Sequence, residues 1–120
     1  MNWEEWVEQA KDYFGSTWGI DITFAGQVAL FYLYLTAYGL SPRITSGYRD
    51  PAHQAELLRR WNAGDRAGLK FKPAASSDHT KRKAVDIVTS NPRLAAQIAK
   101  ALGLGAGMDY GDEVHFFKKG

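Results

Sequence analysis

Apolar residues in the first part of the chain have the spacing of one helix face. They lie three or four positions apart: Trp3, Trp6, Val7, Ala10, Tyr13 and Phe14. This period is typical of an amphipathic helix. Glu4, Glu5 and Glu8 lie on the other side, near the N-terminal end where the helix dipole favours negative charge. We therefore predict a first helix that ends at Gly15.

A second, uncharged run extends from Phe24 to Leu40. Its 17 residues are at the short limit for a membrane span, which needs about 20 apolar residues. The run also contains the polar residues Gln27 and Thr36. We predict a buried core helix that ends at Gly39, and no membrane insertion.

Short strands and two further helices follow. Arg43 to Ser46 is typical of a strand, and Asp50-Pro51 is a helix start, with Asp as N-cap and Pro in the first turn. Residues 64–78 are a loop, and Asn91-Pro92 begins another helix. Strands are expected at 84–88 and 113–117, on either side of that helix. The order predicts an α+β fold with a small antiparallel sheet.

Length and composition limit the possible functions. A chain of 120 residues is one domain, since domains run to about 100–150 residues. The absence of cysteine excludes a thiol nucleophile, a disulfide scaffold and a Cys-ligated metal. Any metal site must therefore use Asp, Glu and the three histidines, which are His53, His79 and His115. The acidic start of the chain argues against a signal peptide.

The net charge of +2 is a mild basic bias. Six cations lie in or next to one loop: Arg66, Lys70, Lys72, Lys81, Arg82 and Lys83. A nucleic-acid binder could use such a loop, and a steep fall in affinity with salt would reveal it. A loop of this kind is more often a solvated face, so we expect no nucleic-acid partner.

One carboxylate and two histidines lie in or next to the predicted strands, where they are candidates for a metal site. Asp86 interrupts an apolar strand, and a buried carboxylate is costly unless it is paired or bound to metal. His115 lies in a second apolar strand, and His79 precedes the first. If the strands are neighbours, the three side chains converge in a set that suits Zn²⁺ with one open position. The alternative is a packed core histidine with a capping or salt-bridged Asp86.

At these residues the chain resembles a known family. Ser77 to Asp86 resembles the S-x-H-x-x-G-x-A-x-D motif of the zinc peptidoglycan peptidases. These include D-Ala-D-Ala carboxypeptidases, vancomycin-resistance dipeptidases and phage L-alanyl-D-glutamate endopeptidases, related in fold to the hedgehog signalling domain. Ile44 to Arg49 with Gln54 resembles the SGYR…Q segment, and Asp112 to Phe116 resembles [DE]-x-x-H-F. The likeness covers about residues 43–117 and leaves out the helical part, residues 1–42.

The resemblance implies a sheet that lines a zinc cleft, with helices packed around it. It implies Zn²⁺ as the cofactor and His79, Asp86 and His115 as its ligands. Asp112 would be the catalytic base, and Arg49 would polarise the scissile carbonyl and stabilise the oxyanion. Three further residues would contact the substrate: Ser77, Gln54 and Arg82.

Two points stay open within this resemblance. Residues i and i+2 share a strand face, so strand parity favours Glu113 as the base, whereas the motif favours Asp112 after a bend at Gly111. Arg82 replaces the motif glycine. A positive φ there would strain it by about 1–2 kcal/mol. Otherwise Arg82 binds an anionic substrate group, which we favour, or simply points to solvent.

The function we expect is zinc-dependent hydrolysis of peptide bonds in peptidoglycan stem peptides. The alternative is a non-catalytic, zinc-containing module that binds the cell wall. A monomer that acts on the bacterial wall, as a phage lysin, virion-borne hydrolase or exported effector, fits the lack of a signal peptide. The motifs leave the cleaved bond open: D-Ala-D-Ala, L-Ala-D-Glu or an interpeptide bridge.

Overall fold

The computed structural model describes residues 2–69 and 78–119. The elements in chain order are α1 Trp3–Trp18, α2 Ile22–Ala37, β1 Arg43–Ser46, α3 Pro51–Asn62, β2 Ala84–Val88, α4 Pro92–Ala101, β3 Leu104–Ala106, the 3₁₀ turn η1 Gly107–Tyr110 and β4 His115–Lys118. The strands form one antiparallel sheet in the order β1-β2-β4-β3. The predicted α+β class is therefore confirmed.

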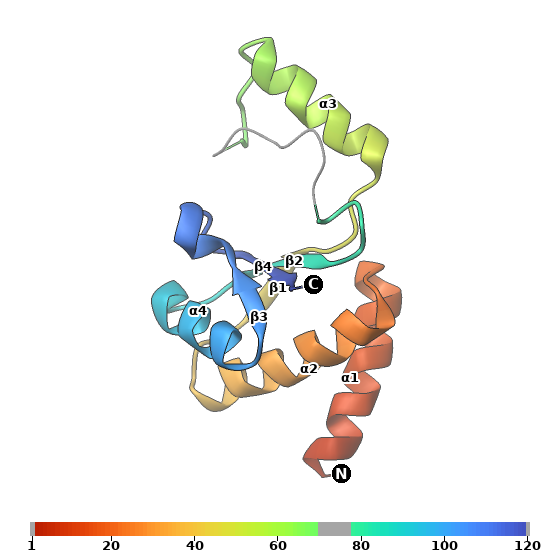
Figure 1. Cartoon of the computed structure of the whole chain (residues 1–120), viewed down its shortest axis with the longest axis vertical. Coiled ribbons are helices and arrows are strands. Elements are labelled where there is room, and N and C mark those ends of the chain that lie inside the picture. The colour runs from red at the N-terminus through yellow and green to blue at the C-terminus, as the bar shows by residue number, and fades with distance from the viewer. Residues whose placement is uncertain (1, 70–77, 120) are drawn as a thin grey trace.

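The sheet has an apolar face and a face that carries the polar cluster. Val85 and Ile87 of β2 and Phe116 of β4 are buried. Phe31 of α2 meets Phe116 edge-on, with ring centroids 4.9 Å apart. Asp86 lies between Val85 and Ile87, and His115 directly precedes Phe116. The two pair across β2 and β4, so their side chains share the other face. In Figure 1 α1 and α2 lie at one end of the molecule and α3 extends away at the other.

The second apolar run forms the central core helix, as predicted. Six residues of α2 are buried: Phe24, Ala25, Val28, Ala29, Phe31 and Leu35. The helix is bounded by Ile22 and Ala37 rather than by Phe24 and Gly39, because the Asp21 carboxylate caps it by accepting from the Phe24 amide. Among the described residues no single helix could cross a membrane by length and hydropathy, although α1 and α2 pass that test as a pair bent by 119°.

The first helix is longer than the sequence predicted. It continues through Gly15 to Trp18, and the chain leaves it at Gly19 with φ 65. A glycine inside a helix is only mildly unfavourable, whereas a left-handed C-terminal residue ends one. Gly19 and not Gly15 is therefore the stop. Within the predicted apolar stripe only Phe14 is buried, while Trp3 and Tyr13 are largely exposed.

The C-terminal strands also differ from prediction. The glycine-rich segment 103–111 contains β3, which pairs with β4 and which the sequence did not indicate. Gly105 of β3 lies opposite Phe117, whose ring occupies the space that a Cβ atom would need. The final strand begins at His115 rather than at Glu113, because residues 113 and 114 form a turn.

Candidate metal centre

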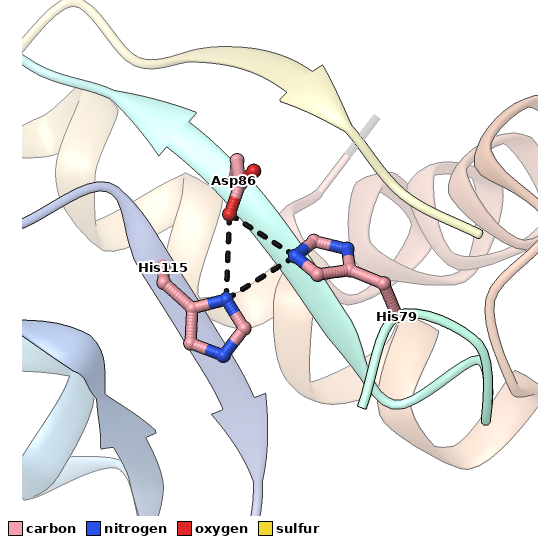
Figure 2. Close-up of side chains that lie close together, drawn as sticks. All are labelled: His79, Asp86 and His115. Atoms are coloured by element: carbon pink, nitrogen blue, oxygen red, sulfur yellow. Dashed lines mark hydrogen bonds and ion pairs between the residues drawn. The ribbon is translucent and has the colours of Figure 1, made fainter. Parts of the chain in front are cut away.

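Three side chains from three segments meet on the open face of the sheet. Asp86 and His115 are register partners on β2 and β4, and His79 reaches over them from the turn before β2. Figure 2 shows the three groups pointing toward one another. The convergence predicted for neighbouring strands is thus present, and the cluster could hold a metal ion.

The three nearest atoms form an almost regular triangle. His79 Nε2 lies 3.2 Å from Asp86 Oδ1 and 3.2 Å from His115 Nδ1, and His115 Nδ1 lies 3.4 Å from Asp86 Oδ1. Tetrahedral bonds of about 2.0–2.1 Å separate neighbouring ligand atoms by about 3.3–3.4 Å. The triangle therefore has the size of three ligands of one small ion with a fourth position open.

The hydrogen-bond pattern also suits a cation. His79 Nδ1 lies 2.8 Å from the Gly47 carbonyl oxygen, which can only accept, so Nδ1 carries the proton. In the neutral ring Nε2 then presents a lone pair to the cluster. Asp86 Oδ1 is buried without a hydrogen-bond partner among the described residues. A lone pair facing a carboxylate oxygen needs a positive charge between them, so the donor set fits a metal ion.

The environment keeps Asp86 ionised. Burial would raise the pKa of its carboxyl group, since desolvation disfavours the charged form. The interaction with the adjacent His115 and His79 rings outweighs burial and holds this pKa well below its usual range. The Asp86 side chain is 18% exposed, so the site opens to solvent on one side. A charged, half-shielded carboxylate is a suitable ligand for a divalent cation.

Arg49 lies beside this cluster, as the motif implied. Its Nη2 is 3.9 Å from Asp86 Oδ2, and its Nη1 donates to Gln54 Oε1 at 2.7 Å. The guanidinium keeps further N–H groups and is 22% exposed. Gln54 is only 1% exposed, so Arg49 is hydrogen-bonded to a buried side chain. A contact between Gln54 and the substrate stays a prediction.

Asp112 and Glu113 lie in the turn before β4. The Asp112 amide donates to the Gly107 carbonyl at 2.8 Å, and the Asp112 carbonyl accepts from the His115 amide at 3.3 Å. Asp112 is half-buried beside His115, whereas Glu113 is exposed. The parity argument for Glu113 lapses because neither residue is in the strand. The role of Asp112 as base stays a prediction.

The remaining predicted residues have different positions. Arg82 has φ 65, so its left-handed backbone, the reason for a glycine in the motif, is present here. Its guanidinium donates to the Gly19 carbonyl and lies over the Tyr48 ring. Binding of a substrate anion by Arg82 stays a prediction. His53 is exposed on α3, and Ser77 lies outside the described residues.

Sequence reasoning missed two neighbours of the cluster formed by His79, Asp86 and His115. The carbonyl of Gly47, the glycine of the SGYR segment, accepts from His79 Nδ1, and a Cβ atom on Gly47 would collide with the backbone of Trp18. The glycine of the SGYR segment was the available signal. Tyr110 lies at the rim, its ring centroid 6.3 Å from that of His115. Burial, then the charge of Asp112, raises the pKa of Tyr110, so the phenol is neutral near pH 7.

No protein-family model matches the chain, and no curated protein matches it significantly. Several solved structures are similar, among them the following three. The vancomycin resistance D,D-pentapeptidase VanY, as a mutant in complex with Zn(II), is 20% identical with a TM-score of 0.63, over 84% of this chain and 73% of that one. VanYB in complex with D-alanine-D-alanine is 20% identical with a TM-score of 0.64, over 84% and 72%. The Serratia marcescens L-Ala D-Glu endopeptidase ChiX is 16% identical with a TM-score of 0.63, over 95% and 86%.

At these identities the likeness establishes the fold. The chain has the α+β fold of these three structures, and the likeness to ChiX covers nearly all of it, including helices outside the sequence motifs.

Proposed function

We propose that this chain is a zinc metallopeptidase that hydrolyses peptide bonds in the stem peptides of bacterial peptidoglycan. The triangle of His79 Nε2, Asp86 Oδ1 and His115 Nδ1 carries the proposal, because its size and donor atoms suit Zn²⁺. Two similar structures support the choice of metal and substrate class. One was solved with Zn(II), and the other holds D-alanine-D-alanine.

The three ligands would leave one coordination position open. When bound, Zn²⁺ supplies Lewis-acid polarisation and makes a neighbouring water more acidic, with a pKa of about 7. The chain's contribution is the arrangement around that ion. The Gly47 carbonyl fixes the tautomer of His79, and the pairing of β2 with β4 fixes Asp86 and His115.

Arg49 would bind the carbonyl oxygen of the scissile bond. Gln54 and Asp86 hold its guanidinium at the edge of the cluster, so little reorganisation is needed when negative charge develops on that oxygen. Removal of one such donor costs roughly 10²–10³-fold in kcat in other enzymes. Arg49→Lys keeps the positive charge but loses the planar arrangement of N–H donors, so the variant should retain only part of the wild-type activity.

Asp112 would accept a proton from the attacking water and pass it to the leaving amine. It is half-buried in the turn that hydrogen-bonds to His115, which supports a place beside the ion. A positioned base of this kind contributes typically about 10²–10⁴-fold. We propose Asp112 rather than the exposed Glu113, and the variants described in the Discussion test that choice.

The test is digestion of purified muropeptides by the zinc-loaded protein, followed by mass spectrometry. Loss of a terminal D-alanine would identify a carboxypeptidase, and cleavage after L-alanine would identify an L-Ala-D-Glu endopeptidase. His115→Ala is the matched inactive variant. Binding to cell walls with no cleavage of any muropeptide would contradict the proposal and favour the non-catalytic wall-binding module.

Action as a monomer at the bacterial wall is part of the same proposal. Light scattering of the protein during digestion would test the monomer, and a salt titration against DNA would test the expectation of no nucleic-acid partner.

A further inference from the structure

Arg82 adopts a backbone conformation that is unusual for an arginine. Its φ is 65, in the left-handed region that favours glycine. Its amide donates to the His79 carbonyl at 3.3 Å, and its carbonyl accepts from the Asp21 amide at 2.9 Å. The residue therefore links the turn of a metal ligand to the corner between α1 and α2. A strained residue at such a junction persists only where surrounding contacts favour it.

The side chain makes a second link to the same corner. Its Nη1 donates to the Gly19 carbonyl at 2.7 Å, and its Cζ lies 3.9 Å from the centroid of the Tyr48 ring. Gly19 ends α1, where the helix dipole is negative and a cation is favourable. The flat guanidinium can stack on the ring and donate in its own plane at once.

Tyr48 completes the enclosure of the corner. Its amide donates to the Trp18 carbonyl at 2.6 Å, and a Cβ atom on Gly19 would lie 2.9 Å from the Tyr48 Cβ. The corner, residues 18–21, is thus held between Tyr48 and Arg82. The helical part of the chain, which the sequence motifs leave out, reaches the metal centre through these contacts.

The same segments hold His79. Its carbonyl accepts from the Arg49 amide at 3.1 Å as well as from the Arg82 amide, and its Nδ1 donates to the Gly47 carbonyl. Residues 47–49 and 82 therefore contact the corner on one side and His79 on the other. A shift of the corner would move the His79 ring and the Arg49 backbone together.

We propose that Arg82 is a positioning residue, whose guanidinium fastens the α1–α2 corner onto the turn of His79 and so fixes His79 and Arg49 for metal binding and catalysis. The effect on zinc binding and catalysis rests on the proposed metal site. The attachment of the α1–α2 corner rests only on the contacts of Arg82 with Gly19 and Tyr48. This role differs from recognition of a substrate carboxylate. If Arg82 only bound substrate, its substitution would change neither the structure of the metal-free protein nor its zinc affinity.

The experiment compares Arg82→Gly and Arg82→Lys with the wild type, and uses Lys81→Gln as the control. Gly removes the guanidinium without backbone strain, whereas Lys keeps the charge without the planar fork. Lys81 is exposed in the same turn, so Lys81→Gln removes one charge without touching Gly19 or Tyr48. Amide hydrogen exchange is measured on the metal-free protein, and the Zn²⁺ dissociation constant by competition with a chelator.

In Arg82→Gly we expect the Asp21 and Arg49 amides to exchange about tenfold faster, as for loss of one hydrogen bond with its stacking contact. The zinc affinity should fall roughly tenfold, at the low end for a residue that orients a ligand. Arg82→Lys should be intermediate in both, and Lys81→Gln should match the wild type.

Unchanged exchange in Arg82→Gly would overturn the inference, and so would a zinc affinity that stays constant or rises. An unchanged zinc affinity with a raised KM for carboxylate-bearing peptides would instead assign Arg82 to substrate recognition. If the wild type binds no zinc, the proposed function fails, while the exchange measurement still decides whether the corner is fastened by Arg82.

Discussion

The proposed ligand His115 is held by its neighbours on the sheet. Its ring stacks on Phe117, with centroids 5.5 Å apart, and faces Asp86 across the strand pair. The ring is therefore preorganised, and its removal takes away one of three ligand atoms rather than a flexible side chain. Loss of a ligand atom is expected for His115 and not for His53, since His53 is exposed on α3, away from the cluster.

We predict that His115→Ala abolishes tight zinc binding. The wild type should carry about one Zn²⁺ per chain, held by three protein ligands. Because bound metal stabilises the native state by mass action, the variant should also lose the rise in Tm that zinc produces. Elemental analysis after dialysis measures the occupancy, and His53→Ala is the matched control. Full zinc occupancy in His115→Ala would contradict the assignment of the site.

We predict that Asp112→Ala retains zinc and loses hydrolysis by roughly 10²–10⁴-fold, as for a lost general base. Glu113→Ala should be much milder, because Glu113 is exposed in the turn. Steady-state cleavage of a stem peptide, with zinc content measured on the same samples, separates the two. An inactive Glu113 variant beside an active Asp112 variant would show that the motif assignment is wrong.

Among the elements, α1 shows how one glycine inside a helix and one directly after it have opposite roles. A Cβ atom on Gly15 would make only ordinary contacts, with Ile22 Cδ1 at 3.6 Å as the nearest. A Cβ atom on Gly19 would lie 2.9 Å from Tyr48 Cβ at a φ of 65. The first glycine is inside the helix, and the second ends it.

Gly15→Ala should therefore raise the free energy of unfolding by about 0.5–1 kcal/mol, because alanine favours helix more than glycine does. Gly19→Ala should lower it by at least about 1 kcal/mol, the cost of a left-handed non-glycine residue. Urea denaturation followed by circular dichroism measures both. A destabilised Gly15→Ala would mean that the helix ends near Gly15, as the sequence alone suggested.

Strand β3 contains Gly105, whose lack of a side chain leaves space for a neighbouring ring. The Phe117 ring occupies the space over Gly105, and the same ring stacks on His115. Gly105→Ala should lower the free energy of unfolding by about 1–3 kcal/mol through overpacking. It should also weaken zinc binding, because Phe117 must shift away from its place beside the ligand.

The double variant Gly105→Ala, Phe117→Leu is the internal control for that prediction. The smaller side chain should recover part of the stability by relieving the overlap. Chemical denaturation and zinc competition on the single and double variants give the coupling between the two positions. Additive effects would show that Gly105 and Phe117 do not share the space.

In the whole molecule, the core helix α2 packs against the sheet. Phe31 of α2 and Phe116 of β4 are buried against each other, and Phe116 follows the ligand His115 directly. The helical part and the motif-bearing part thus share a core, so we expect them to unfold together.

Phe31→Ala should lower the free energy of unfolding by about 3–5 kcal/mol, the usual cost of removing a buried phenylalanine. Tyr38→Ala, at a residue that is 61% exposed, should change it by no more than about 0.5 kcal/mol. Thermal melts followed by circular dichroism and tryptophan fluorescence should coincide. A helical transition that clearly precedes loss of the sheet would contradict a shared core.

Local sequence patterns determined most of the elements. Asp50-Pro51 and Asn91-Pro92 placed the starts of α3 and α4, because caps act within one helical turn. The apolar run at 24–40 identified the core helix α2, and the composition of 84–88 gave the strand β2. The three residues of the candidate metal cluster could also be named from the sequence, since Asp86 and His115 interrupt apolar strands and the motifs supply their order.

Tertiary structure decided what depends on distant partners. Helix α1 continues past Gly15 because the corner at Gly19 packs between Tyr48 and Arg82, and β3 forms because Gly105 leaves room for Phe117. The Gly47 carbonyl that orients His79 lies 32 residues away along the chain. Such contacts depend on side-chain shape and backbone approach across the fold, and no local pattern of polar and apolar residues encodes them.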